Sequence, residues 1–200
     1  MQRKTRTSNN PAGRPRSGNV TDRIHAAVFA LMKDGPYGDL SIEAIAARAG
    51  VSRPALYRRY ATVGQITLGA LQAAGSTILP MPHTTDVRRD LCLYFNSLVT
   101  SIAEETVIGR ALRGALATAL SEPGIGPHFA RFIEKRREPV RQRLLAWNDA
   151  LTSARLDTAL DSMFGPILYR LLIRRVRVQK NHVNDVVDRA LKWIAHDSGT

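Results

Sequence analysis

Two short amphipathic patterns meet at Gly50, and they constrain the fold more than any other part of the sequence. Ser41 is a typical N-cap for the first pattern, which has apolar residues at helical spacing and ends at Gly50. Ser52 can cap the second pattern, and Pro54 lies in its first turn, where a missing N–H is tolerated. We therefore expect a short helix, a tight turn and a second short helix that continues to about Tyr60, which is a helix-turn-helix.

Helical patterns also fill the rest of the chain. Apolar residues recur at helical spacing in the segments 21–33, 62–79, 87–103, 108–120, 128–151, 158–176 and 182–196. Clusters of glycine and proline separate these segments, among them Pro80-Met81-Pro82 and the stretch 122–127. Since no segment alternates in the manner of a strand, we expect an all-α fold of about nine helices.

The charge of the chain favours a polyanionic partner. The formal net charge is +12, which suits a nucleic acid or an anionic membrane surface. Cys92 is the only cysteine, so the chain can form neither an internal disulfide nor a zinc site built on cysteine pairs. Because no segment has about 18 consecutive apolar residues, we expect a soluble, cytoplasmic protein without a membrane span.

The second helix of the predicted helix-turn-helix has a basic face. Leu56 is expected to pack against the first helix, which leaves the basic and hydroxyl-bearing side chains for a partner. Those side chains are Arg53, Tyr57, Arg58, Arg59 and Tyr60. An arginine guanidinium can bind guanine O6 and N7 or a phosphate, and a tyrosine hydroxyl can reach a phosphate oxygen.

The segment 21–74 resembles the DNA-binding domain of the TetR family of transcriptional regulators. The resemblance lies in Ile45-Ala46-Ala47-Arg48-Ala49-Gly50-Val51-Ser52 and Leu56-Tyr57-Arg58-Arg59-Tyr60, followed by a helix that Thr62 can cap. It implies a three-helix DNA-binding domain, which we assign to residues 20–79. The DNA contacts expected from the resemblance and the basic face are Ser41, Ser52, Arg53, Ala55, Tyr57, Arg58, Arg59, Tyr60 and Thr62. Thr62-Val63-Gly64 departs from the family pattern, because the lysine that commonly reaches a phosphate is absent.

Residues 1–19 are expected to form a disordered basic arm, since they have almost no apolar side chains. Gly13-Arg14-Pro15-Arg16 resembles the core of an AT-hook, whose arginines enter a narrow A·T minor groove. Arg14 and Arg16 are therefore candidate DNA contacts. Attraction of a disordered arm to phosphates explains the same residues equally well.

The C-terminal part resembles one subclass of the same family. The resemblance lies in Phe164-Gly165-Pro166 and Tyr169-Arg170-Leu171-Leu172, which a basic link and a last amphipathic helix follow. It implies a helical domain over residues 80–200 that binds an effector and dimerises through its last two helices as a four-helix bundle. The residues expected at the dimer interface are Leu168, Leu171, Leu172, Val183, Val186, Val187, Leu191 and Ile194. The alternative is that these residues only close the core of one chain.

The candidates for an effector pocket are mainly large apolar side chains of the central helices, with two polar groups among them. They are Phe95, Asn96, Leu112, His128, Phe129, Phe132, Trp147, Met163 and Phe164. Taken singly, each fits a core position better than a ligand wall, and the sequence does not identify the ligand.

Two other classes of protein are the alternatives. The sequence has no P-loop, no His-Glu-x-x-His motif and no Gly-x-Ser-x-Gly elbow, so we expect no enzyme. A basic protein that binds RNA or a membrane surface would account for the charge, but not for the organisation of residues 41–60. We therefore predict a DNA-binding transcriptional regulator that acts as a repressor in the TetR manner, without cofactor or metal. It is expected to bind an operator as a homodimer and to be released by a small-molecule effector.

Overall fold

The computed structural model describes residues 17–103 and 105–196, and within them the chain is all-helical. The α-helices are α1 (Ser17–Asp34), α2 (Ile42–Ala49), α3 (Arg53–Tyr57), α4 (Val63–Ile78), α5 (Val87–Ser101), α6 (Val107–Ser121), α7 (Gly126–Trp147), α8 (Ser153–Leu168) and α9 (Lys180–His196). A 3₁₀ turn covers Tyr37–Asp39, and a π segment covers Tyr169–Ile173. The predicted all-α fold is confirmed.

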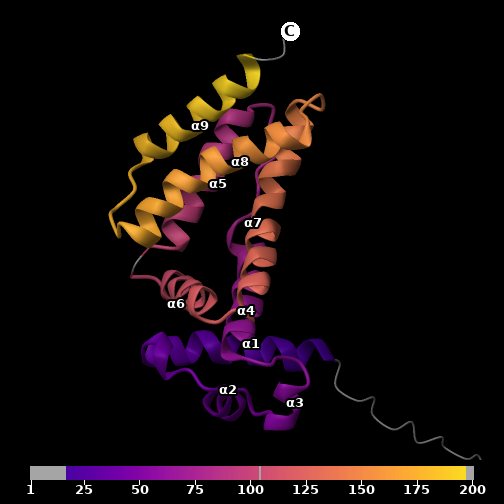
Figure 1. Cartoon of the computed structure of the whole chain (residues 1–200), viewed down its shortest axis with the longest axis vertical. Coiled ribbons are helices and arrows are strands. Elements are labelled where there is room, and N and C mark those ends of the chain that lie inside the picture. Colours follow the sequence, from indigo (N-terminus) through magenta and orange to yellow (C-terminus); the bar gives the residue numbers. More distant parts are fainter. Residues whose placement is uncertain (1–16, 104, 197–200) are drawn as a thin grey trace, which may run out of the picture.

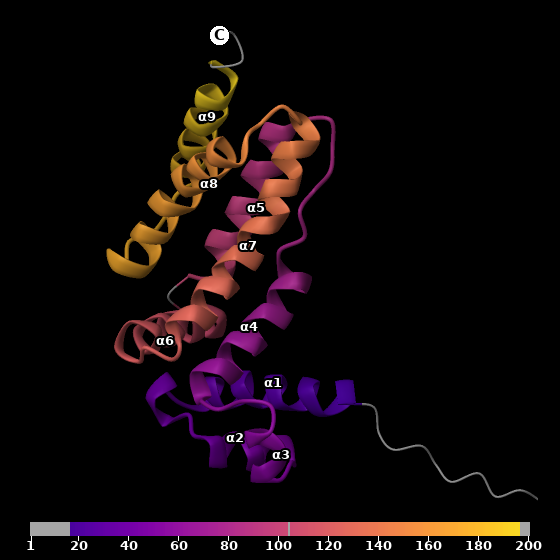
Figure 2. The same cartoon turned by 45° about the vertical axis from the view of Figure 1, so that its right-hand side comes forward.

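The helices form two groups that α4 joins. Figures 1 and 2 show α1, α2 and α3 at one end of the molecule, α4 leading away from them, and α5–α9 beyond. α1 packs on α2 and α4, α6 packs on α1 and α4, and α9 packs on α5 and α8. None of the described helices combines the length and apolar character that a membrane span requires. Contact between the two groups therefore runs largely through α4 and α6.

Side-chain caps fix the helix starts that the sequence predicts around the turn. The hydroxyls of Ser41, Ser52 and Thr62 each accept a hydrogen bond from the N–H three residues later. Gly50 has a φ of 62°, the left-handed conformation that ends α2. The Gln65 side chain accepts the N–H of the residue before Thr62, one position earlier than in a standard capping box.

Several helix ends differ from the predicted ends: α7 ends at Trp147 instead of residue 151, α8 begins at Ser153 instead of residue 158, and two ends differ near the helix-turn-helix. α1 begins at Ser17, within the predicted arm, instead of at Thr21, and α3 ends at Tyr57 instead of near Tyr60. Beyond α3, the N–H groups of residues 59 and 60 both bond to the carbonyl of Leu56. This turn leads the chain from α3 toward α4.

A buried ion pair ties the link between α4 and α5 to α7. Asp90 is fully buried, and its carboxylate accepts a hydrogen bond of 2.7 Å from Arg143 Nε. It also accepts the backbone N–H of Thr84 at 2.9 Å and the Thr84 hydroxyl at 2.8 Å, while Arg143 donates to the Thr84 carbonyl at 3.0 Å. Burial alone would raise the pKa of Asp90, but the hydrogen bonds from Arg143 and Thr84 outweigh it and hold that pKa below its ordinary value.

The residues predicted for a dimer interface are buried or partly buried within a single chain. The buried ones are Leu171, Val183, Val186, Val187 and Ile194. The others, Leu168, Leu172 and Leu191, are partly buried against the same core. Because α9 packs on α5 and α8 of its own chain, these side chains contribute to the core of one chain, and their place at a dimer interface stays a prediction.

Candidate nucleic-acid interface

α3 lies at one end of the molecule (Figure 1), and its outer face is basic and exposed. Leu56 has no exposed surface and fixes α3 to the core, whereas 53% of Tyr57 is exposed. The Arg53 side chain, one helical turn before Tyr57, is 64% exposed. Arg58 and Arg59 directly after the helix are also exposed. Residues at the start of a recognition helix are the ones that meet base edges, so Arg53 has the position that base contact requires.

Weak contacts within the helix-turn-helix hold two of these guanidiniums. Arg53 Nη1 lies 3.6 Å from Glu43 Oε1 of α2. Arg59 Nη1 donates to the carbonyl of Ala55 at 3.1 Å, and Ala55 itself is partly buried. Exposed pairs of this kind contribute little free energy, so both guanidiniums can turn to a phosphate or a base.

A histidine of α1 supports the segment that follows α3. His25 Nε2 lies 2.9 Å from the hydroxyl of Tyr60, and Gly69 of α4 makes room for this pair, since a Cβ there would lie 2.9 Å from His25 Nε2. Burial lowers the pKa of His25 below 6.5, so the imidazole is neutral at neutral pH. Tyr60, expected as a DNA contact, is partly buried and holds the end of the helix-turn-helix to α1.

The three hydroxyl caps occupy the starts of α2, α3 and α4. Because Ser41, Ser52 and Thr62 accept hydrogen bonds from their own helices, an approaching phosphate would meet the remaining free N–H groups of those helix starts. Arg14 and Arg16 lie outside the described residues, so the minor-groove arm stays a prediction.

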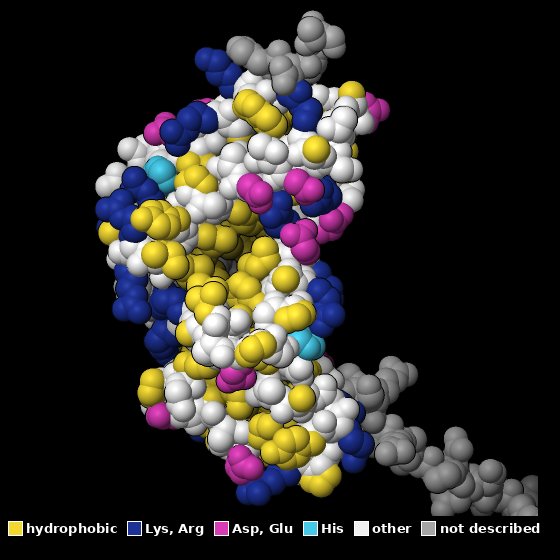
Figure 3. All heavy atoms as spheres, viewed as in Figure 1, with side chains coloured by type: hydrophobic (Ala, Val, Ile, Leu, Met, Phe, Trp, Pro, Cys, Tyr) yellow, Lys and Arg dark blue, Asp and Glu magenta, His cyan; other side chains and the backbone are white. Residues whose placement is uncertain are grey.

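An apolar cavity of about 60 Å³ lies among α4, α5, α6, α7 and α8. Three of the predicted pocket residues line it, namely Leu112, Phe132 and Phe164. Leu168, predicted for the dimer interface, lines it as well, and Arg136 and Arg137 are charged lining residues. Figure 3 shows hydrophobic side chains gathered around a hollow midway along the molecule.

Three other predicted pocket residues belong to the core around the cavity. Phe95 and Met163 have no exposed surface. The Phe95 ring packs edge-on against Phe164, with 5.0 Å between the ring centroids, and Phe129 lies 6.0 Å from Phe132 by the same measure. These side chains support the lining residues without lining the cavity themselves.

The last three predicted pocket residues lie away from the cavity. Trp147 is 39% exposed at the end of α7. The Asn96 amide donates to the Cys92 carbonyl at 2.7 Å and borders a separate polar groove beside the segment before α9. His128 Nε2 lies 3.0 Å from Gln65 Nε2, where α7 meets the start of α4. The sequence pattern could not separate these positions from the cavity wall, because helical phase alone does not show where packing leaves space.

One face of α6 borders the cavity, and another face of α6 contacts α1. Leu112 lines the cavity, whereas Gly114 lies against the ring of Tyr37, close enough that a Cβ would be 2.2 Å from Tyr37 Cγ. Arg110 donates to the carbonyl of Met32 in α1. A glycine inside a helical pattern is the sequence signal that could have indicated this close approach. α6 therefore connects the cavity wall to the helices that hold α3.

Known protein families match both the N-terminal and the C-terminal part of the chain. Residues 24–62 match the model described as bacterial regulatory proteins, tetR family, and residues 81–190 match the tetracyclin repressor-like C-terminal domain. The chain is 26% identical over 194 residues to the HTH-type transcriptional regulator YdeS of Bacillus subtilis, which covers 94% of this chain and 96% of YdeS. It is 28% identical over 147 residues to the HTH-type regulator AqdR of Rhodococcus erythropolis, covering 74% and 67%. The solved structure of the TetR family regulator SCO0332 has a TM-score of 0.75 at 24% identity, over 87% of this chain and 97% of that one.

Proposed function

The chain belongs to the TetR family of DNA-binding transcriptional regulators, and we propose that it is a repressor that binds its operator as a homodimer and leaves it when a small molecule binds. Residues 20–79 would contact DNA, and residues 80–200 would bind the effector and the second copy. Its DNA partner implies action in the cytoplasm. The observation that carries this proposal is the exposed pair of Arg53 and Tyr57 on a capped α3, which Leu56 anchors to the core.

The arrangement of α4 and α6 supports release by an effector. Both helices line the cavity and both pack on α1, which holds α2 and the segment after α3. An effector that binds more tightly to a widened cavity would shift the equilibrium toward that form, and the shift would move α1 and α3 relative to α4. The two α3 helices of a dimer must lie about 34 Å apart to enter successive turns of the major groove. A small movement of α3 in each copy is therefore enough to disrupt the fit of the dimer to its operator.

The outward side of α8 is the surface that we propose for dimerisation. Exposed residues with small or aromatic side chains follow one another there at helical spacing. They are Ala154, Thr158, Ser162, Gly165 and Tyr169. Trp193 of α9 is 42% exposed, and Arg155 of α8 lies over its ring at 5.0 Å. Small side chains allow two helices to approach closely, and a two-fold dimer matches a palindromic operator.

Gly165→Arg is expected to weaken dimerisation about fivefold to a hundredfold, because overpacking a close contact costs roughly 1–3 kcal/mol. A Cβ at Gly165 meets no atom within 4 Å in the protomer, so the variant should fold normally. Sedimentation equilibrium measures the dissociation constant. Gly124→Arg is the matched control, since a Cβ at Gly124 also meets nothing within 4 Å. Equal association of both variants and the wild type would contradict the proposed surface.

The proposed function predicts a specific complex with DNA that flanks the protein's own gene. Labelled duplexes from that region, titrated in an anisotropy assay, should bind in the presence of competitor DNA. The affinity should fall steeply as salt rises, because binding releases counterions from each phosphate contacted. Equal affinity for these duplexes and for random duplexes of the same length would exclude specific regulation.

A further inference from the structure

Arg136 carries a charge that nothing in the described part of the chain neutralises. Its side chain lines the apolar cavity, and no carboxylate of the described residues lies within ion-pair distance of it. The Arg136 Nε is buried and has no hydrogen-bond partner. A half-buried guanidinium without a carboxylate is less favourable than a paired one, so a counter-ion at this position would stabilise the protein.

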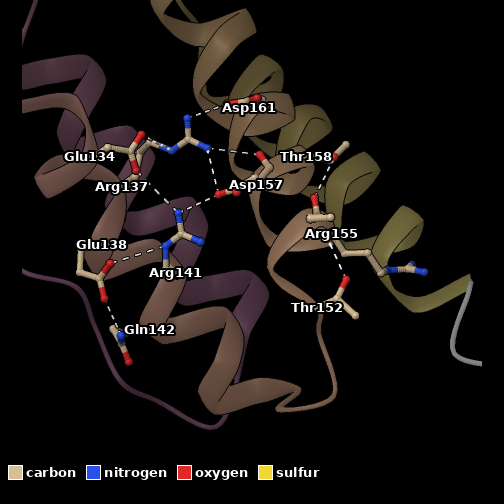
Figure 4. Close-up of polar contacts among 11 residues, drawn as sticks. Glu134, Arg137, Glu138, Arg141, Gln142, Thr152, Arg155, Asp157, Thr158 and Asp161 are labelled. Atoms are coloured by element: carbon tan, nitrogen blue, oxygen red, sulfur yellow. Dashed lines mark hydrogen bonds and ion pairs between the residues drawn. The ribbon is translucent and has the colours of Figure 1, made fainter. Parts of the chain in front are cut away.

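Arg137 and Arg141, which follow Arg136 on α7, are both paired with carboxylates (Figure 4). Arg137 lies 2.6 Å from Asp161 Oδ1 and 3.7 Å from Glu134 Oε1. Arg141 lies 2.8 Å from Asp157 Oδ1. Both point toward the carboxylates of α7 and α8, whereas Arg136 points toward α4.

The groups that contact the Arg136 guanidinium are neutral. Its Nη2 donates to the Gln72 carbonyl at 3.3 Å, and its guanidinium lies 5.9 Å from the Phe132 ring centroid. Burial raises the pKa of the neighbouring Tyr94 to about 12, so its phenol stays protonated and supplies no negative charge. Burial also lowers the pKa of Arg136, which indicates the cost of keeping this charge away from water.

The guanidinium also closes the cavity against α4. A Cβ at Gly75 would lie 1.6 Å from Arg136 Nη1, so the side chain occupies the space that glycine leaves. At about 60 Å³, the cavity has room for about two water molecules. An organic ligand must therefore displace lining side chains, and Arg136 is long and flexible enough to move toward it.

We propose that the cavity binds an amphipathic organic anion, with an apolar body among Leu98, Leu112 and Phe164 and a carboxylate or similar head group on Arg136. This inference rests on the proposed effector role of the cavity and adds the chemical class of the effector. The head group would draw the guanidinium away from the Gln72 carbonyl and Gly75, and would thereby loosen the contact between α7 and α4. Ligand binding would in this way act on the helix that leads to the helix-turn-helix.

Calorimetric titration of the full-length protein tests the proposal with two acids, octanoate and 4-phenylbutyrate, each beside its neutral primary amide. At least one acid should bind about tenfold to a hundredfold more tightly than its amide, as a hydrogen-bonded charge pair would give. Arg136→Gln should abolish this preference and Arg136→Lys should retain it. Arg131→Gln, which removes the same charge from an exposed position on α7, should leave it unchanged.

Three results would overturn the proposal: amides that bind as tightly as acids, a preference that survives Arg136→Gln, or no binding of either acid. Circular dichroism checks the fold of each variant, and the comparison of acid with amide on the wild type decides the matter if Arg136→Gln does not fold. Operator release is measured separately. An acid that binds through Arg136 without releasing operator would contradict the effector role, but not the ligand class.

Discussion

Arg53→Ala is expected to weaken operator binding by about 2–6 kcal/mol per dimer, because one arginine–base contact contributes about 1–3 kcal/mol and a dimer has two. The corresponding change in affinity is roughly thirtyfold to twenty-thousandfold. Thermal stability should be unchanged, since the Arg53 side chain is 64% exposed and only a 3.6 Å contact joins it to Glu43. Anisotropy titration with the operator duplex measures the effect.

Arg89→Ala provides the matched control for this experiment. Arg89 is exposed on α5, in the other group of helices, so its replacement removes the same charge without touching α3. If Arg53→Ala and Arg89→Ala bind operator equally well, Arg53 has no contact with DNA. If Arg53→Ala weakens specific and random duplexes to the same extent, Arg53 binds a phosphate and not a base.

Asp90→Ala is expected to lower the free energy of unfolding by about 3–5 kcal/mol, because it leaves the buried Arg143 without its partner. For a chain of this size, the melting temperature should fall by roughly 6–20 °C. Urea unfolding and thermal scans measure the two quantities. The double variant Asp90→Ala/Arg143→Met removes both charges and should recover a large part of the loss. If Asp90→Ala is as stable as the wild type, the Asp90–Arg143 ion pair contributes nothing to the free energy of unfolding.

The Asp90–Arg143 ion pair also predicts how the free energy of unfolding depends on pH. The folded protein holds the pKa of Asp90 below its ordinary value, so the contribution of the carboxylate is fully present above about pH 3.9, the unfolded value. It is lost as the pH falls through the lower folded pKa. The difference in stability between the wild type and Asp90→Ala should therefore narrow in strong acid, and a constant difference from pH 7 to pH 2 would contradict this assignment.

Local chemistry made much of the helix-turn-helix predictable from the sequence. Ser41, Ser52 and Thr62 cap helices because a hydroxyl satisfies an N–H that the helix leaves free. Gly50 ends α2 because it adopts the left-handed conformation without strain. The early start of α1 was missed because the polar composition of residues 1–19 gives no apolar pattern from which to place it.

The partners of the more distant elements could not be predicted in the same way. The apolar stripe with Val183 and Val187 shows that α9 is covered, but the stripe is the same whether its own chain or a second copy covers it. Arg136 and Arg137 are equally basic in the sequence, and only the helical phase of α7 relative to α4 and α8 gives carboxylates to one of them. The cavity depends on small differences in packing volume, which periodicity does not record.

The double contact of α6 has a consequence for anyone who would redesign this protein as a biosensor. In a repressor released through this cavity, as proposed, substitutions at Leu112 would change ligand selectivity and the packing beside Gly114 and Tyr37 together, so selection for a new ligand there would alter the response threshold as well. α5 and α8 pack chiefly on α7 and α9. Leu98 and Phe164 line the same cavity from those two helices, so under the proposed mechanism they are the positions at which ligand selectivity would vary with the least effect on operator release.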